Sequence, residues 1–356
     1  MHPYSKLPAR SFWKKFVSDS PWFALQLNDE PKFRLHVDDR VATAGSCFAQ
    51  HITRYMQRAG LPPYVAEPAH PLMIEHGGNV ESYGVFSARY GNIYTVRHGV
   101  ELFEQAFGII PMIEDFAEHE GRWFDLLRPN VQKEGYASRH EAQADRAYHL
   151  ERVRAMFETA DVFVFTLGLT ECWFNSAAGH TYPACPGTVR GTYDPEIHHF
   201  RNFTHAEVVA DLDRLIGELG RVNPRLKLIL TVSPVPLVAT RTGHNVLVAS
   251  AYSKAVLRAA AGEVEAKHDH VAYFPSYEIV SHPASFGQYL ASDLREVTER
   301  GVAHVMRCFL SSFYGIEPQT GRGEVPVVAG AENAVAVAPR VEAPLPECDE
   351  LFNSAP

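Results

Sequence analysis

The chain has 356 residues, 46% of them hydrophobic, and a formal net charge of -9 at pH 7. This length supplies one large domain or two small ones, and the acidic balance gives no reason to expect nucleic acid or a membrane as a partner. The five cysteines are widely spaced and contain no CxxC pair, so neither a disulfide framework nor a zinc ribbon is expected. The absence of a signal-like N-terminus and of any run of ~18 apolar residues predicts a soluble, cytoplasmic protein.

The first predicted strand is Val41–Ala44, which leads through a Gly-Ser-Cys-Phe-Ala turn into a helix predicted over Ser46–Ala59. Apolar residues recur at helical spacing along this helix, and Gly60 follows it as a stop signal. Pro63–Ala66 is a candidate second strand. The stretch from about residue 70 to 130 fits no strand–helix unit, so it is predicted to be an insertion after the second strand.

Beyond the insertion, buried-type strands alternate with helices. The strands are predicted over Asp161–Leu167, Leu226–Val232 and Val271–Phe274, and the helices over Glu141–Thr159, from a capping box at Thr204, over Ser250–Ala260 and over Thr298–Phe313. This alternation predicts an α/β fold, a three-layer sandwich with a mainly parallel sheet. The predicted organisation is an N-terminal extension over 1–35, one domain over 36–316 and an Ala/Pro-rich mobile tail over 317–356.

The turn at residues 45–49 has the chemistry of an active site. Glycine permits a tight turn, and the N-terminus of the following helix stabilises a thiolate or a developing oxyanion at Cys47. An ordinary strand–turn–helix with a half-buried cysteine explains the same local pattern. Ligands of a parallel sheet bind beyond the carboxyl ends of its strands, where the segments Gly168–Glu171 and Ser233–Pro236 are also expected.

These motifs resemble the GSCFA family, which is named for the residues found here at 45–49. The resemblance extends over about residues 35–315 and includes GNIYT at 91–95, FTLGLTECW at 165–173, TVSPVP at 231–236 and YFPSYEIV at 273–280. The GSCFA family looks like a branch of the SGNH/GDSL hydrolases. The resemblance therefore implies a flavodoxin-like fold and acyl-transfer chemistry.

The resemblance assigns roles to particular residues. Alignment with the Gly-Asp-Ser-Leu block of the superfamily makes Cys47 the nucleophile, and a shift of one residue would make it Ser46. Gly168 and Thr170 occupy the oxyanion-binding Gly-x-Asn block, with threonine in place of asparagine, and Glu171 follows them in the expected cleft. Gly84 is the choice for the second-block glycine, and Gly78 is the alternative.

The fifth block of the superfamily supplies an aspartate and a histidine. Here Asp293 matches the aspartate, but Glu296 stands where the histidine belongs. Three explanations stay open: the Glu296 carboxylate performs part of the role of the missing histidine, a histidine from elsewhere supplies the base, or the site is not hydrolytic. His244 is the first choice among the histidines because it follows the TVSPVP strand end, ahead of His304, His282 and His76. A cysteine nucleophile needs a base less than serine does.

The leading prediction is therefore an esterase or O-acyltransferase that acts on a small-molecule or glycan ester. The carbohydrate-type substrate is implied by the resemblance. No cofactor and no metal are expected, since His198, His199 and His205 lack a convincing ligand spacing; a thioester is the acyl donor that transfer would use. The alternatives are a catalytically silent glycan-binding module and an interaction protein whose tail recruits an unknown partner.

Overall fold

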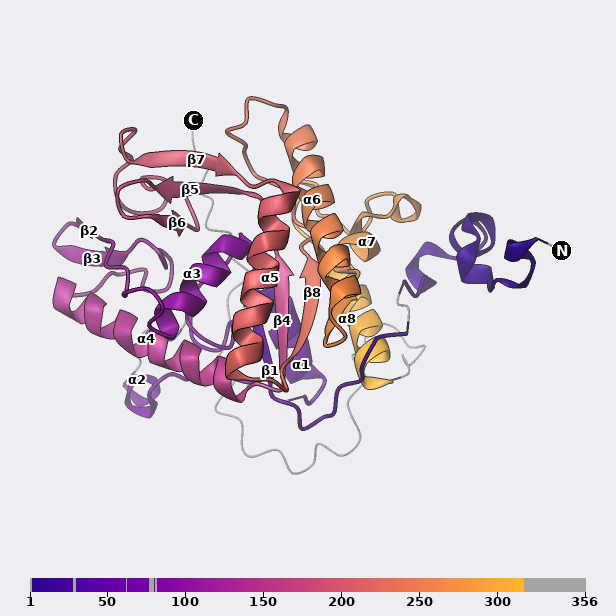
Figure 1. The fold of residues 1–356 in the computed structure, drawn as a ribbon, viewed down its shortest axis with the longest axis horizontal. Coiled ribbons are helices and arrows are strands. Elements are labelled where there is room, and N and C mark those ends of the chain that lie inside the picture. The colour runs from indigo at the N-terminus through magenta and orange to yellow at the C-terminus, as the bar shows by residue number, and fades with distance from the viewer. Residues whose placement is uncertain (1, 28–29, 62, 77–79, 81, 317–356) are drawn as a thin grey trace.

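A computed structural model describes residues 2–27, 30–61, 63–76, 80 and 82–316. Its centre is a four-stranded parallel sheet with the strand order β1-β4-β8-β9. The strands are β1 (Val41–Gly45), β4 (Val162–Leu167), β8 (Lys227–Val232) and β9 (Val271–Phe274). All four run in one direction, so their carboxyl ends share one edge of the sheet, shown at the top in Figure 1. The three apolar runs predicted as buried strands are β4, β8 and β9.

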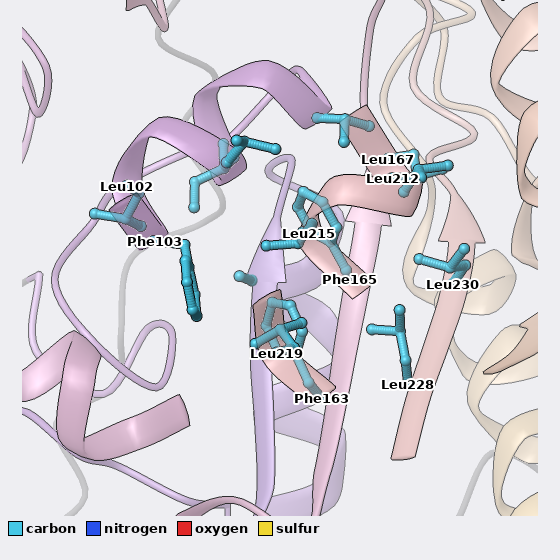
Figure 2. Close-up of a cluster of buried hydrophobic side chains, with 14 of the residues drawn as sticks. Leu102, Phe103, Phe163, Phe165, Leu167, Leu212, Leu215, Leu219, Leu228 and Leu230 are labelled. Atoms are coloured by element: carbon cyan, nitrogen blue, oxygen red, sulfur yellow. The ribbon is translucent and has the colours of Figure 1, made fainter. Parts of the chain in front are cut away.

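Helices cover both faces of this sheet, which gives three layers. One face packs against α3 (Val96–Ala106), α4 (Arg139–Thr159), α5 (His205–Val222) and α6 (Val246–Lys267). Figure 2 shows how leucines of α5 interdigitate with Phe163, Phe165, Leu228 and Leu230 of the sheet. The other face packs against α1 (Ala49–Arg58), α7 (Ser276–Ser281) and α8 (Glu299–Tyr314). A fully buried sheet requires apolar strands, which explains their near-continuous hydrophobicity.

Local signals in the sequence locate the helix ends well. The Thr204 side chain accepts from the Glu207 backbone N–H, and the Glu207 carboxylate accepts from the Thr204 backbone N–H, which is the predicted capping box of α5. Gly60 adopts a φ of 75° directly after α1, as a helix stop requires. The start of α1 was predicted too early, because residues 46–48 form a turn and the helix begins at Ala49.

The predicted second strand is wrong. Residues 63–66 form no strand, although Tyr64 N–H donates to the Val41 carbonyl at 3.3 Å. Pro63 has no N–H to contribute to a ladder, and other parts of the insertion bind β1 instead. The Ser87 and Ile93 N–H groups donate to the Thr43 and Gly45 carbonyls at 3.5 and 2.8 Å. The outer edge of β1 is thus covered by irregular chain.

The insertion consequently follows the first strand and α1, not a second strand of the sheet. It contains α2 (Pro71–Glu75), α3 and the antiparallel pair β2 (Phe116–His119) and β3 (Arg122–Asp125). The helix α3 was not predicted from the sequence, and every residue in it except Arg97 is buried, polar Glu101 and Gln105 included.

A second insertion lies between β4 and α5. It is a three-stranded antiparallel sheet with the order β6-β5-β7, built from β5 (Glu171–Asn175), β6 (His180–Tyr182) and β7 (His198–Asn202). Figure 1 shows it above α3, next to the carboxyl edge of the main sheet. No strand of this sheet was predicted from the sequence.

The N-terminal residues form four short helical segments: η1 (Pro3–Lys6), η2 (Ala9–Ser11), η3 (Lys14–Ser18) and η4 (Trp22–Ala24); a fifth segment, η5 (Pro283–Ser285), follows α7. His304 Nε2 and the Leu25 carbonyl lie 2.9 Å apart, which fastens the end of this arm to α8. The predicted tail over 317–356 lies outside the described residues. Within the described ranges, no helix has the length and apolar character needed to cross a bilayer.

Candidate functional site

The turn between β1 and α1 depends on the glycine at its start. Gly45 has a φ of 130°, and a Cβ atom placed on it would lie 2.2 Å from the Thr166 carbonyl oxygen of β4. A side chain would therefore collide with the neighbouring strand. The Ser46 N–H donates to that same carbonyl at 3.1 Å, and the Ala49 N–H donates to the Ser46 carbonyl at 2.9 Å. Close approach to β4 thus fixes the turn at the carboxyl end of β1.

Both candidate nucleophiles in the turn are buried. Ser46 is 1% exposed and Cys47 is 4% exposed. The Ser46 hydroxyl has no hydrogen-bond partner among the described residues. A buried hydroxyl without a partner carries a desolvation cost, which a bound substrate or water would relieve.

The turn after β4 packs directly against Ser46. A Cβ atom on Gly168 would lie 3.2 Å from the Ser46 Cβ atom and 2.9 Å from the Tyr94 carbonyl oxygen, so glycine is again required. The Gly168 and Leu169 N–H groups donate to the Tyr94 carbonyl at 3.1 and 2.8 Å. Tyr94 belongs to the GNIYT segment, which therefore joins the turns after β1 and β4.

This arrangement limits which groups can act as oxyanion donors. The Thr170 N–H donates to Ser253 Oγ at 3.0 Å, and the Gly168 N–H is engaged by Tyr94. The Thr170 hydroxyl is fully buried and has no partner within the part of the chain described. Of the two groups predicted as oxyanion donors in the Gly-x-Asn block, the Gly168 N–H is therefore bonded and the Thr170 hydroxyl is not.

Glu171 joins the loop after β8 to the same edge. Its carboxylate accepts from Thr240 Oγ1 at 2.7 Å and from the Arg241 N–H at 3.4 Å. Burial raises the pKa of Glu171 above its usual value, in opposition to the Thr240 hydrogen bond. Glu171 therefore holds two loops together at this edge.

Three buried polar residues of α6 bind the loops of this edge, and sequence reasoning missed them. Ser250 Oγ accepts from the Leu237 N–H at 3.1 Å, Ser253 Oγ accepts from Thr170, and Lys254 Nζ donates to the Gly168 carbonyl at 2.7 Å. The signal was their spacing of i, i+3 and i+4, which puts them on one face of an otherwise Ala- and Val-rich helix.

The two residues predicted for the fifth block lie on the surface. Asp293 and Glu296 are both exposed. The Asp293 carboxylate accepts from the Arg295 and Glu296 N–H groups, each at 3.0 Å, and these bonds lower its pKa. Arg295 Nη2 lies 3.4 Å from the Pro236 carbonyl oxygen and joins this loop to the segment after β8. The carboxylate of Asp293 thus stabilises its own turn.

The candidate histidines occupy different surroundings. His244 is exposed in the loop before α6, and its N–H donates to Thr242 Oγ1. His304 is buried in α8 beside Tyr289, and burial lowers its pKa to about 4. His282 ends α7, where burial lowers its pKa. His76 ends the short helix α2.

His51 of α1, four residues after Cys47, was not among the predicted site residues. Its ring centroid lies 5.4 Å from that of Phe48, and burial, followed by Arg54, lowers its pKa to about 4. It is therefore neutral at pH 7. The only signal in the sequence was the Cys-x-x-x-His spacing, because Cys47 lies in the turn before α1 and not on the helix itself.

Of the two glycines predicted for the second block, the structure describes Gly84. Gly84 has a φ of 71° in a turn of the insertion, with open space where a Cβ atom would lie. Gly78 lies outside the described residues. No group of three His, Cys, Asp or Glu side chains suited to a metal ion occurs in the portion of the chain that the structure describes.

Comparison with known proteins gives one result. The model of the GSCFA family matches residues 40–309, which is more than half of the chain. Searches of curated proteins and of solved structures find no match. The matched range contains the turns after β1, β4 and β8 and ends within α8.

Proposed function

This chain belongs to the GSCFA family, and from that premise we propose that it is an acyl-transfer enzyme, either an esterase or an O-acyltransferase. The proposed substrate is a carbohydrate-type ester, and the proposed nucleophile lies in the turn at residues 45–49. The observation that carries the proposal is the packing of Ser46 against Gly168 at the carboxyl edge of a parallel sheet. This edge is where ligands of such sheets bind.

The strand order supports the relationship to SGNH-like hydrolases. A flavodoxin-like sheet has the order 2-1-3-4-5, and β1-β4-β8-β9 corresponds to the last four positions. The place of the remaining strand, beyond β1, is taken by the covering chain around Tyr64 and Ser87. On this reading the insertion has replaced one strand of the parent fold.

In the proposed reaction the sulfur of Cys47 attacks the acyl carbonyl, and a thioester forms. The thiol proton leaves with the sugar oxygen, and water or a second hydroxyl then takes the acyl group and restores the thiol. The proton acceptor in this scheme is neutral His51, four residues after Cys47 in the sequence, and His244 and Glu296 are the alternatives that the sequence suggested. No cofactor enters this scheme; for transfer, the acyl donor is a thioester.

A catalytically silent glycan-binding module is the second candidate. It is favoured by the exposure of Asp293 and Glu296 and by the engagement of the Gly168 N–H with Tyr94. A third idea, partner recruitment by the tail, concerns residues outside the described part of the chain.

The test is acyl release from a panel of acetylated sugars and chromogenic esters, with wild type, Cys47→Ala, Ser46→Ala and Cys185→Ala. The proposal expects Cys47→Ala to abolish release, Ser46→Ala to retain part of it, and Cys185→Ala to retain all of it. Loss with Ser46→Ala alone would make Ser46 the nucleophile. Wild-type protein that binds glycans but releases no acyl group from any ester would favour the silent module.

A further inference from the structure

A lysine is buried beside the candidate site. Lys254 is 3% exposed, although an ammonium group is among the costliest groups to remove from water. Its Nζ donates to the Gly168 carbonyl at 2.7 Å. Gly168 is in turn packed against Ser46, so one backbone residue separates the ammonium from the turn that holds Ser46 and Cys47.

Two unpartnered donors lie on the two turns that pack together at Gly168. The Ser46 and Thr170 hydroxyls are 1% and 0% exposed and have no hydrogen-bond partner among the described residues. The desolvation cost of these two hydroxyls is offset when an anionic oxygen accepts hydrogen bonds from them, because charge-assisted hydrogen bonds are stronger than neutral ones. The Lys254 ammonium binds the Gly168 carbonyl of the turn that also carries Thr170, and a positive charge at that place favours a negatively charged group.

We propose that Lys254 is a positioning residue that supplies the positive charge of this site and makes it selective for an anionic oxygen. The ammonium holds the Gly168–Thr170 turn against Ser46, and its field acts through a low-dielectric interior where screening is weak. The chemical class of ligand is a carboxylate or the oxyanion that forms when an acyl carbonyl is attacked. A catalytic role for this charge rests on the proposed function, whereas selectivity for an anionic group does not.

The experiment compares alkylation of Cys47 by neutral iodoacetamide and anionic iodoacetate, followed by mass analysis of the Cys47 peptide. Both reagents attack the same thiolate. The effects of the thiol pKa and of access to Cys47 are therefore common to both rates, and the ratio of the rates reports the local electrostatic potential. We expect Lys254→Met to lower the iodoacetate-to-iodoacetamide ratio by at least about fivefold. Lys254→Arg keeps the charge and should keep the ratio.

Lys227→Met is the matched control. Lys227 is at the amino end of β8, at the opposite edge of the sheet, and its Nζ lies 3.3 Å from the Arg34 carbonyl oxygen. The replacement removes the same charge and the same kind of hydrogen bond, and the ratio should stay at the wild-type value. Structural damage at position 254 would change both rates together and leave the ratio unmoved.

An unchanged ratio in Lys254→Met, an equal fall in Lys227→Met, or a wild-type Cys47 that reacts with neither reagent would each overturn the inference. These outcomes are separate from failure of the proposed function. If the protein shows no ester activity but the alkylation ratio still falls in Lys254→Met, the anion-selective site stands and only the acyl-transfer proposal fails.

Discussion

Gly45 and Thr166 lie so close together that the Thr166 carbonyl oxygen occupies space where any Cβ atom on residue 45 would have to be. This relationship ties the candidate nucleophile turn to the neighbouring strand. It also makes the turn sensitive to the smallest possible side chain.

We expect Gly45→Ala to lower the free energy of unfolding by about 3–5 kcal/mol, since it combines a backbone collision with an unfavourable φ. Urea denaturation measures the change. The control is Gly217→Ala on the exposed side of α5, where a Cβ atom meets open space and better helix propensity should add about 0.5–1 kcal/mol. Equal effects at both positions would contradict this account of the turn.

The cysteines should differ in reactivity. Burial raises the pKa of Cys172 to about 12 and the pKa values of Cys185 and Cys308 to about 11, so at pH 8 all three are almost entirely protonated and unreactive. In a Cys348→Ser background we expect Cys47, at the start of α1, to be alkylated first. Peptide mass analysis over time provides the measurement, and faster labelling of half-buried Cys185 would show that exposure outweighs thiolate content.

Asp145 is the centre of a buried charge network between the insertion and α4. Its carboxylate accepts from Arg89 Nη1 and Arg128 Nη2, each at 2.9 Å, and from the Tyr136 hydroxyl at 2.6 Å. Burial alone would raise the pKa of Asp145, but the Arg128 and Arg89 guanidinium groups outweigh it and lower that pKa. We expect Asp145→Asn to cost about 3–5 kcal/mol at pH 7, because two buried arginines lose their shared counter-charge.

The pH dependence of this effect has a definite sign. A lowered folded-state pKa gives stability that is present above the unfolded value of about 3.9 and is lost as pH falls through the folded value. The difference between wild type and Asp145→Asn should therefore shrink below about pH 4. Glu158→Gln, which removes an exposed pair with Arg154 on the same helix, is the control and should have little effect. A constant difference from pH 7 to pH 3 would rule out this coupling.

Buried His98 predicts a second pH effect at milder acidity. Burial, followed by Arg146, lowers the pKa of His98 to about 3. The unfolded chain takes up this proton below about pH 6.5 and the folded chain does not, so stability falls as pH drops from 6.5 towards 3. We expect His98→Leu to reduce that slope by about 1.4 kcal/mol per pH unit. Parallel stability curves for the two proteins between pH 6.5 and 4.5 would contradict the prediction.

Much of the parallel sheet was predictable because its strands are buried on both faces and read as continuous apolar runs. The helix α3 was not predicted, and the burial of its polar Glu101 depends on bonds from the Thr181 N–H and hydroxyl. Tertiary partners that far along the chain leave no local pattern. The strand prediction at 63–66 failed for another reason. These residues suit a strand, but Pro63 and competition from Ser87 and Ile93 prevent a ladder with β1.

The candidate site, like the fold, was predictable only in part. The glycine turns after β1 and β4 were predictable, because tight turns at strand ends demand glycine. The contribution of α6 was not, since Ser250, Ser253 and Lys254 acquire their importance from carbonyl and N–H groups on loops more than ten residues away. The assignment of Cys47 over Ser46, and the roles of His244, Asp293 and Glu296, remain predictions for the experiments above.

The covered edge of β1 has a consequence for how copies of this protein behave in concentrated solution. An open edge strand offers a row of unpaired backbone groups that recruits strands from other molecules. Here Tyr64, Ser87 and Ile93 already donate to the outward carbonyls of Val41, Thr43 and Gly45. This part of the insertion covers the sheet on that side, so edge-to-edge aggregation through β1 would first require the insertion to separate from the strand.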